Sequence, residues 1–337
     1  MQHAAAPEKT PDLPGTALYR HMVRARVISG RMVALQRRGA IGYHSASIGD
    51  EAAIVGAVLA MRPSDWIFPG AREWYAALAR GMPLATYVHH AFGSAEDPAK
   101  GHSAPDHAPA RTLHVVPPSG VVGAHLMQSV GVAWAAKIAR EDVAVLTLFG
   151  AEVADGGDFH NAMNFAGVFK TPVVFVGRAF GDRRLADRAV AYGLANARVD
   201  GSDALAVFSV VRAALARATD GRGATLVEVT MPSFPELASR EDAAFESGDL
   251  VDLGATDPVT RLRSALSGGV DARGHVDEVR RELDEAIAAA ERAGAPLPAT
   301  IFDHVYAGVP AHLAAQRRLL TDSHEVVPRD PRGSTGG

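Results

Sequence analysis

The residues whose types and spacing point to chemistry lie in one stretch, between Glu141 and Gly181. A turn that begins at Gly150 carries Glu152 and Asp155, whose carboxylate oxygens are ligands of the kind that magnesium takes. Glycine-rich turns also let backbone N–H groups approach phosphate oxygens, which a carboxylate repels. The turn could therefore serve a cation through its carboxylates, whereas Glu152 opposes the binding of phosphate.

Two apolar runs flank this turn and position it. Residues 143–149 and 172–176 are rich in valine, and residues 159–169 between them read as a helix. We predict a strand–helix–strand crossover in a parallel sheet, in which the second strand ends in a glycine-bounded turn at 177–181. Ligands of such sheets bind beyond the carboxyl ends of the strands. The turns that follow the two strands should therefore face one site.

Residues 157–172 (GDFHNAMNFAGVFKTP) resemble the thiamine-diphosphate motif of the alpha subunits of the decarboxylating component of 2-oxo acid dehydrogenase complexes, the pyruvate and branched-chain enzymes. Other landmarks of that family, such as residues 49–53 (GDEAA), occur in the same order from about Leu18 to Leu320. The resemblance implies an α/β thiamine-diphosphate-binding fold, with a parallel sheet flanked by helices on both faces and a helical C-terminal extension. It also implies thiamine diphosphate and magnesium as cofactors, and a beta subunit as the partner in a heterotetramer.

The two ends of the motif depart from the family pattern. The family opens with Gly-Asp-Gly, where this chain has Gly150, Ala151 and Glu152, and it closes with an Asn pair, where this chain has Ala179 and Phe180. In the family, the Asp and the second Asn bind the magnesium ion that holds the diphosphate. Neither an alanine methyl nor a phenyl ring can donate a lone pair to magnesium. We therefore expect no metal site at these positions.

Other cofactor positions of the family are kept in part. The resemblance places Arg72 at the cofactor phosphates, although the residue before it is alanine where the family has tyrosine. An arginine at a helix start is also commonly a surface or ion-pair residue, so this alternative stays open. With Gly150, Glu152 and Gly181, Arg72 would make up a vestigial cofactor-binding site.

Candidate catalytic residues are few. His107 matches the histidine of the family's Lys-Gly-Arg-x-Met-Pro-x-His segment, but in a chain with 14 histidines it could equally be a surface residue. Glu236 falls on the catalytic-site histidine of the family, and an exposed glutamate stays ionised at neutral pH and cannot donate a proton. The family segment that folds over the cofactor is missing, because Phe180 is followed almost directly by the element at 186–193.

The composition limits the classes of partner. The net charge is −4 and no basic patch indicates nucleic acid or an anionic membrane surface. Cysteine is absent, which excludes disulfides, thiolate metal sites and a cysteine nucleophile. No membrane span or export signal is recognisable, so we expect a cytoplasmic protein. We predict disordered tails at 1–14 and 325–337 around a single domain at 15–324.

Three functional hypotheses follow, and they leave open whether the chain is an enzyme. It is an alpha-subunit-like component that has lost cofactor-dependent decarboxylation, or an active 2-oxo acid or acetoin dehydrogenase alpha subunit with a metal site rearranged around Glu152 or Asp155. A nicotinamide-dependent dehydrogenase is disfavoured, because no Gly-x-Gly-x-x-Gly turn follows a predicted strand. An empty cavity is destabilising, so we also predict that Arg178 pairs with Glu152, or that Arg178 and Phe180 fill the metal and diphosphate positions.

Overall fold

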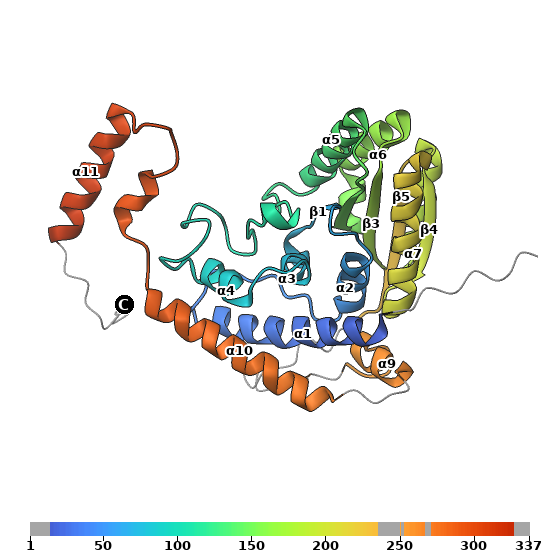
Figure 1. The fold of residues 1–337 in the computed structure, drawn as a ribbon, viewed down its shortest axis with the longest axis horizontal. Coiled ribbons are helices and arrows are strands. Elements are labelled where there is room, and N and C mark those ends of the chain that lie inside the picture. Colours follow the sequence, from blue (N-terminus) through green and yellow to red (C-terminus); the bar gives the residue numbers. More distant parts are fainter. Residues whose placement is uncertain (1–13, 235–249, 251–252, 267–270, 327–337) are drawn as a thin grey trace, which may run out of the picture.

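The protein contains a five-stranded parallel sheet, which lies at the right in Figure 1. The computed structural model describes residues 14–234, 250, 253–266 and 271–326. The strands lie in the order β1-β2-β3-β5-β4, and every neighbouring pair is parallel. Their bounds are β1 Trp66–Phe68, β2 Val145–Gly150, β3 Val173–Phe180, β4 Ala195–Asp200 and β5 Thr225–Met231. This arrangement confirms the predicted α/β class with a parallel sheet.

Helices cover both faces of the sheet, as predicted. Side chains of β2 alternate between the two faces, so that Leu146 and Leu148 join one core cluster while Val145 and Phe149 join the other. On the first face lie α1 (Gly15–Arg37), α2 (Glu51–Leu59) and α7 (Ala204–Arg217). On the second lie α5 (Ala124–Ala139), α6 (Gly157–Phe169) and the 3-10 segment η4 (Leu185–Tyr192).

The predicted crossover is present as β2, a 3-10 turn η3 (Ala151–Asp155), α6 and β3. The predicted end of the second strand is wrong, because β3 continues through Gly177 to Phe180. Gly177 is required by packing, since a Cβ there would lie 2.2 Å from Cδ2 of Leu185. The chain turns one residue after the strand, at Gly181, where a φ of +69° favours glycine.

A buried ion-pair cluster joins three helices of the first face. Arg26 of α1 donates from Nε to Glu51 at 2.8 Å, and from Nη1 to Asp257 at 2.8 Å. Glu51 opens α2, and Asp257 caps α9 (Pro258–Ala265) by accepting from the backbone N–H of Val259. All three charged side chains are almost fully buried. Because a lone buried charge is very costly, the cluster fixes how the N-terminal and C-terminal parts of the chain meet.

The short helix α3 (Tyr75–Ala79) precedes α4 (Leu84–Phe92), and a second buried polar network anchors the loop that follows α4. His44 lies 3.2 Å from Oγ of Ser29 and 3.3 Å from Oδ1 of Asp106, which also accepts from the hydroxyl of Tyr87 at 2.9 Å. The residue types match those of a nucleophilic triad. However, Ser29 and the side chains of His44 and Asp106 have no exposed surface, so a substrate has no access and the network is structural.

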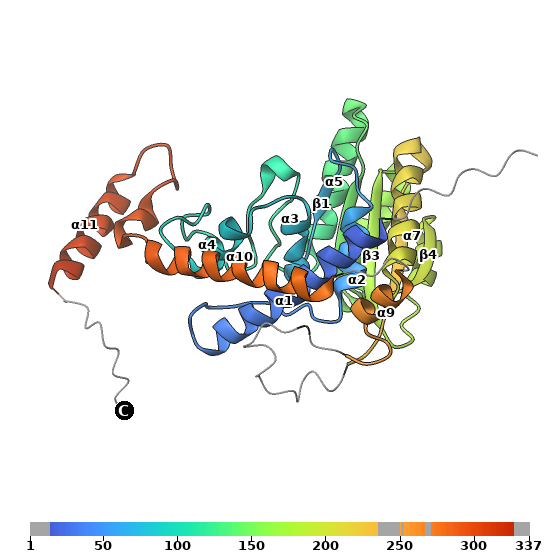
Figure 2. The same cartoon turned by 60° about the horizontal axis from the view of Figure 1, so that its bottom comes forward.

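The C-terminal extension begins with α10 (Ala272–Ala293), which crosses α1 and packs on α4 (Figure 2). A 3-10 segment η7 (Pro298–Phe302) and helix α11 (Ala311–Val326) follow. The predicted C-terminal tail began at residue 325 and so includes the last two residues of α11, whereas residues 327–337 and 1–13 lie outside the described part. In that part, the structure contains no helix with the length and apolarity that crossing a membrane would need.

Candidate functional site

The candidate site lies at the carboxyl edge of the sheet, where β2 ends at Gly150 and β3 ends at Phe180. Gly150 is aligned with Arg178 in the register of these two strands. The N-terminus of α6 follows the turn after β2. The N-terminus of α5 also lies against that turn, because a Cβ on Gly123 would be 3.0 Å from Cγ1 of Val153. The N-termini of α5 and α6 therefore lie at the turn that follows β2, and the end of β3 lies beside the end of β2.

Arg178 is the central charge of this edge. Its guanidinium donates to Asp50 at 2.5 Å and to Glu73, and the exposed fractions of the three side chains are 6%, 5% and 1%. Arg72 approaches the same Asp50 carboxylate at 3.5 Å, with half of its own side chain exposed. Two carboxylates thus neutralise Arg178, and Arg72 adds a weaker contact at the surface.

The electrostatics of this cluster follow from burial and pairing. Burial raises the pKa of Asp50, and the nearby Arg178 and Arg72 offset only part of that rise. Burial alone would lower the pKa of Arg178, but Glu73 and Asp50 outweigh it, so the net pKa is raised. The guanidinium therefore stays charged, and its two carboxylate partners compensate for its removal from water.

The predicted ion pair between Glu152 and Arg178 is wrong, because the salt-bridge partners of Arg178 within the described residues are Asp50 and Glu73. Glu152 is exposed and its carboxylate folds over Gly150, where a Cβ would lie 2.1 Å from Oε1. Sequence reasoning missed both partners of Arg178, because Asp50 appeared only within the landmark at 49–53 and Glu73 was not singled out. The signal available in the sequence was that Glu73 directly follows Arg72 and that Asp50 directly precedes α2.

Between the N-termini of α5 and α6 lies an open hollow of about 330 Å³. Glu152 and Asp158 contribute its only charged side chains among the described residues, and the others are glycine or valine. The hollow is thus acidic, and a diphosphate placed there would meet two carboxylates and no cation. The lining residues are Val122, Gly123, Glu152, Val153, Gly156, Gly157 and Asp158.

The residues present do not fit a magnesium diphosphate. Ala151 and Ala179 are fully buried apolar residues, and Phe180 is 45% exposed at the end of β3. None of them offers an oxygen from its side chain. Across the described ranges, no group of three or more His, Cys, Asp or Glu side chains could hold a metal ion. Glu152 and Asp158 are the carboxylates of the hollow, and neither stands at the position of the Asp or of the second Asn of the family pattern.

The structure places the other predicted residues as follows. The ring of His107 donates from Nδ1 to the carbonyl of Pro105 at 2.9 Å within its own loop, and His107 does not line the acidic hollow. Gly181 forms the turn after β3. Glu236 lies outside the described residues. His125, which sequence reasoning did not single out, is buried at the start of α5 and donates from Nε2 to the carbonyl of Leu148 at 3.0 Å.

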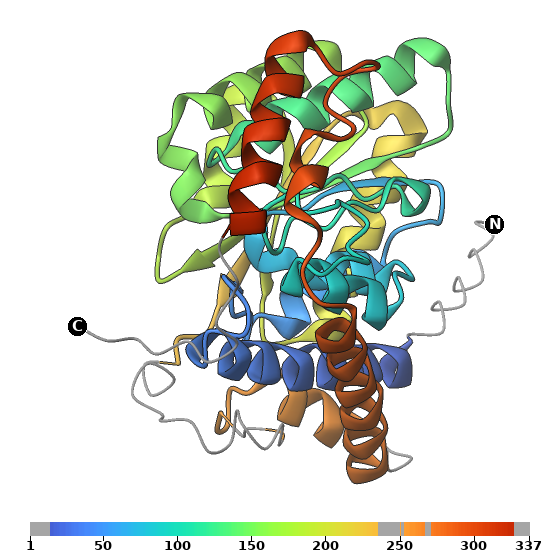
Figure 3. The ribbon, with the colours of Figure 1, turned by 90° about the vertical axis from the view of Figure 1, so that its left-hand side faces the viewer.

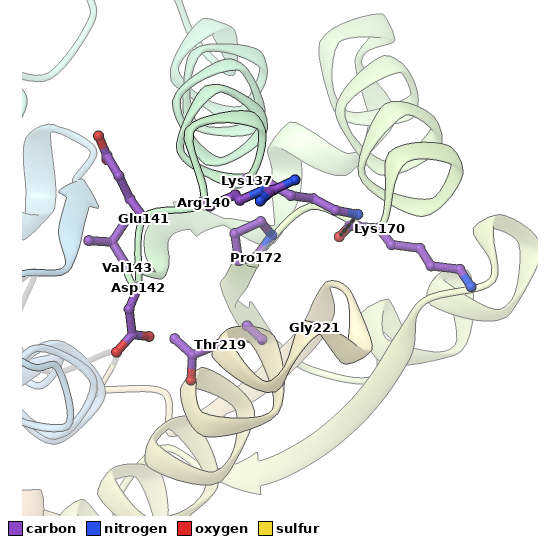
Figure 4. Close-up of a pocket in the computed structure, with 10 residues that line it drawn as sticks. Lys137, Arg140, Glu141, Asp142, Val143, Lys170, Pro172, Thr219 and Gly221 are labelled. Atoms are coloured by element: carbon purple, nitrogen blue, oxygen red, sulfur yellow. Dashed lines mark hydrogen bonds between the residues drawn. The ribbon is translucent and has the colours of Figure 1, made fainter.

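A second hollow, of about 270 Å³, lies at the opposite, amino edge of the sheet (Figure 4). Three basic side chains approach it, but Lys137 already donates from Nζ to the carbonyls of Phe169 and Lys170, and the amino end of Lys170 points away from Lys137. The acidic residues Glu141 and Asp142 share the rim. This mixture of charges, already engaged in part, does not form a defined anion site.

The parallel sheet, its crossover and the position of the site define a thiamine-diphosphate-enzyme fold. Residues 19–298 match the family described as the dehydrogenase E1 component, and the chain belongs to this family, whose members use thiamine diphosphate and magnesium. Within it, the chain is an alpha-subunit-type member related to the branched-chain and pyruvate enzymes.

Two relatives illustrate this similarity. A 3-methyl-2-oxobutanoate dehydrogenase subunit alpha from Mycobacterium tuberculosis is 34% identical over 92% of this chain and 88% of its own length. A 2-oxoisovalerate dehydrogenase subunit alpha from Bacillus subtilis is 30% identical over 88% of this chain and 96% of its own. A transketolase from Campylobacter jejuni shares the fold, with a TM-score of 0.52 and 15% identity. That likeness covers 95% of this chain but only 53% of the transketolase, so the chain spans about half of its length.

Proposed function

We propose that the chain is an alpha-subunit-type component of a 2-oxo acid dehydrogenase that has lost cofactor-dependent decarboxylation and acts as a non-catalytic subunit beside a beta subunit. One observation carries the proposal. At the sheet edge where the resemblance puts the metal and diphosphate, the protein has buried alanines at 151 and 179 and an arginine, Arg178, already held by two carboxylates. The acidic hollow beside them offers no cation to a diphosphate.

The intact packing supports a retained scaffold. Both core clusters are continuous across the sheet, and the buried Arg26 cluster joins the helices of the first face with full pairing. Changes that removed ligands at the site while leaving the core intact are those expected of a subunit whose fold is still used for assembly.

Titration calorimetry tests the proposal directly. Thiamine diphosphate with magnesium is titrated into the chain alone, and into the chain co-purified with the beta subunit encoded in the same genome. We expect a dissociation constant in the millimolar range or weaker for the chain alone, and no restoration of micromolar binding by the complex. Micromolar binding in either sample would overturn the loss of cofactor use.

A second candidate is an active alpha subunit with a rearranged metal site, and the acidic hollow is the observation in its favour. Glu152 and Asp158 both line it. Under this second candidate, magnesium and the diphosphate would bind in the hollow, and Glu152→Gln would weaken the binding of thiamine diphosphate with magnesium. If the chain does not bind the cofactor, Glu152→Gln leaves the calorimetric result unchanged, and this difference separates the two candidates.

A further inference from the structure

Two buried ion-pair clusters meet at the start of α2. Asp50 directly precedes this helix and accepts from Arg178, near the end of β3, at 2.5 Å. Glu51 is the first residue of the helix and accepts from Nε and Nη2 of Arg26 in α1, at 2.8 Å and 2.9 Å. Consecutive residues of one helical turn thus bind two arginines that belong to distant parts of the chain.

Each arginine also holds a second carboxylate on another element. Arg178 donates to Glu73, the last residue of a short 3-10 segment. Arg26 donates from Nη1 to Asp257, the N-cap residue of α9, at 2.8 Å. The exposed fractions of the six charged side chains in the two clusters lie between 1% and 6%. A series of buried charges therefore leads from the carboxyl edge of the sheet, through the start of α2, to α9.

The far end of this series is α9, whose position depends on Asp257. In Figures 1 and 3, α9 is drawn in orange below α1, and the strands lie above α1. The main contacts of α9 are with α1 and α2. Asp257 accepts from the backbone N–H of Val259 and from the hydroxyl of Thr260, so the same carboxylate that binds α1 also caps α9. An altered ion pair at Asp257 is therefore felt by the whole helix.

The shared first turn of α2 joins the two clusters. Burial is the main cause of the raised pKa of Asp50, and the neighbouring charge of Glu51 adds to it. Without Arg178, Asp50 keeps only the weak contact of Arg72, so this poorly solvated carboxylate is drawn toward water. Glu51 follows, because it is the next residue of the same turn, and its movement strains the pair with Arg26 that holds α9 in place.

We propose that the two clusters act as one conformational unit that couples the carboxyl edge of the sheet to α9. A change at the edge that draws Arg178 away from Asp50 loosens α9, and release of α9 loosens the edge in return, because coupling between two sites is reciprocal. The inference goes beyond the proposed function and holds whether or not the chain binds the cofactor.

Hydrogen–deuterium exchange of the full chain, followed by mass spectrometry, measures the coupling from both ends. Arg178→Met breaks the series at the edge. Asp257→Asn removes the charge at α9, while asparagine still offers an oxygen to the N–H of Val259. Arg183→Met is the matched control, because it removes an arginine a few residues further along whose pair with Asp155 is exposed. Helix α6, on the other face of the sheet, is the internal reference, since global unfolding exposes its amides as well.

In Arg178→Met, we expect the exchange rate of amides 258–265 to rise at least about tenfold more than that of α6. In Asp257→Asn, amides 73–79 should show the same excess over α6, and this variant decides the question by itself if Arg178→Met does not fold. Arg183→Met should leave both regions within about twofold of the wild-type rates. Arg178→Lys keeps the charge and should raise exchange in α9 less than Arg178→Met does.

Two results would overturn the inference. Either each variant raises exchange only at its own end of the series, or α6 changes as much as the distant element does. In both cases the clusters are independent, and the proposed function is untouched, because titration with thiamine diphosphate and magnesium tests it separately.

Discussion

The guanidinium of Arg178 donates to the carboxylate of Asp50 at 2.5 Å across 128 residues of sequence, inside the edge of the sheet where the family holds its cofactor. Glu73 accepts from the same guanidinium. A fixed cation of the protein thus lies among carboxylates at this edge, and its charge is already balanced. This relationship gives Arg178, Asp50 and Glu73 a structural role at the carboxyl edge of the sheet.

Replacing Arg178 by methionine should lower the free energy of unfolding by about 3–5 kcal/mol. The change leaves Glu73 buried without its ion-pair partner and leaves Asp50 with only the weak contact of Arg72, and removal of one partner is the costly way to break a buried pair. Urea unfolding followed by circular dichroism measures the loss. Arg183→Met is the control, because the ion pair of Arg183 with Asp155 is exposed and should contribute less than about 1 kcal/mol. Equal losses of unfolding free energy in the two variants would show that the buried cluster stabilises the fold no more than an exposed ion pair does.

His125 should make stability fall as the pH decreases below neutrality. Burial lowers its pKa, and the carbonyl of Leu148 and the charge of Glu73 offset only part of that effect. His125 therefore takes up a proton near pH 6.5 in the unfolded chain but only at a lower pH in the folded chain. Its contribution to the free energy of unfolding is present above pH 6.5 and is lost as the pH falls below that value.

The comparison of wild-type protein with His125→Gln isolates this contribution. Glutamine can still donate to the carbonyl of Leu148 but does not titrate. Between pH 8 and pH 5.5, the free energy of unfolding of the wild-type chain should fall by up to about 1 kcal/mol more than that of the variant. His21, whose pKa is also lowered by burial, is present in both proteins and cancels. Parallel pH profiles for the two proteins would contradict the prediction.

Restoring the family residues at the site should recover part of the cofactor binding. The variant combines Ala151→Asp, Glu152→Gly, Ala179→Asn and Phe180→Asn, which returns the oxygen ligands and removes the carboxylate beside the diphosphate. We expect binding of thiamine diphosphate with magnesium to tighten at least about tenfold in titration calorimetry. Glu152→Gly alone is the control for simple charge removal. No improvement at all would make the missing covering segment, and not the ligands, the larger defect.

The sequence alone determined the elements whose patterns are local. The valine-rich runs around a helical stretch predicted β2, α6 and β3, because the pattern of buried side chains along a strand or a helix follows the period of that element. The residue types at 151, 179 and 180 by themselves showed that side-chain oxygens are missing there.

Only the tertiary structure decided where the strands end and which charges meet. β3 continues past Gly177 because Ala179 and Phe180 pair with Thr230 and Met231 of β5, a strand about fifty residues later in the chain. Likewise, Arg178 pairs with Asp50 and Glu73, at separations of 128 and 105 residues, rather than with Glu152 on the adjacent strand end. A buried charge is stabilised by whichever counter-charges the packed helices bring to it, and sequence proximity carries no information about that packing.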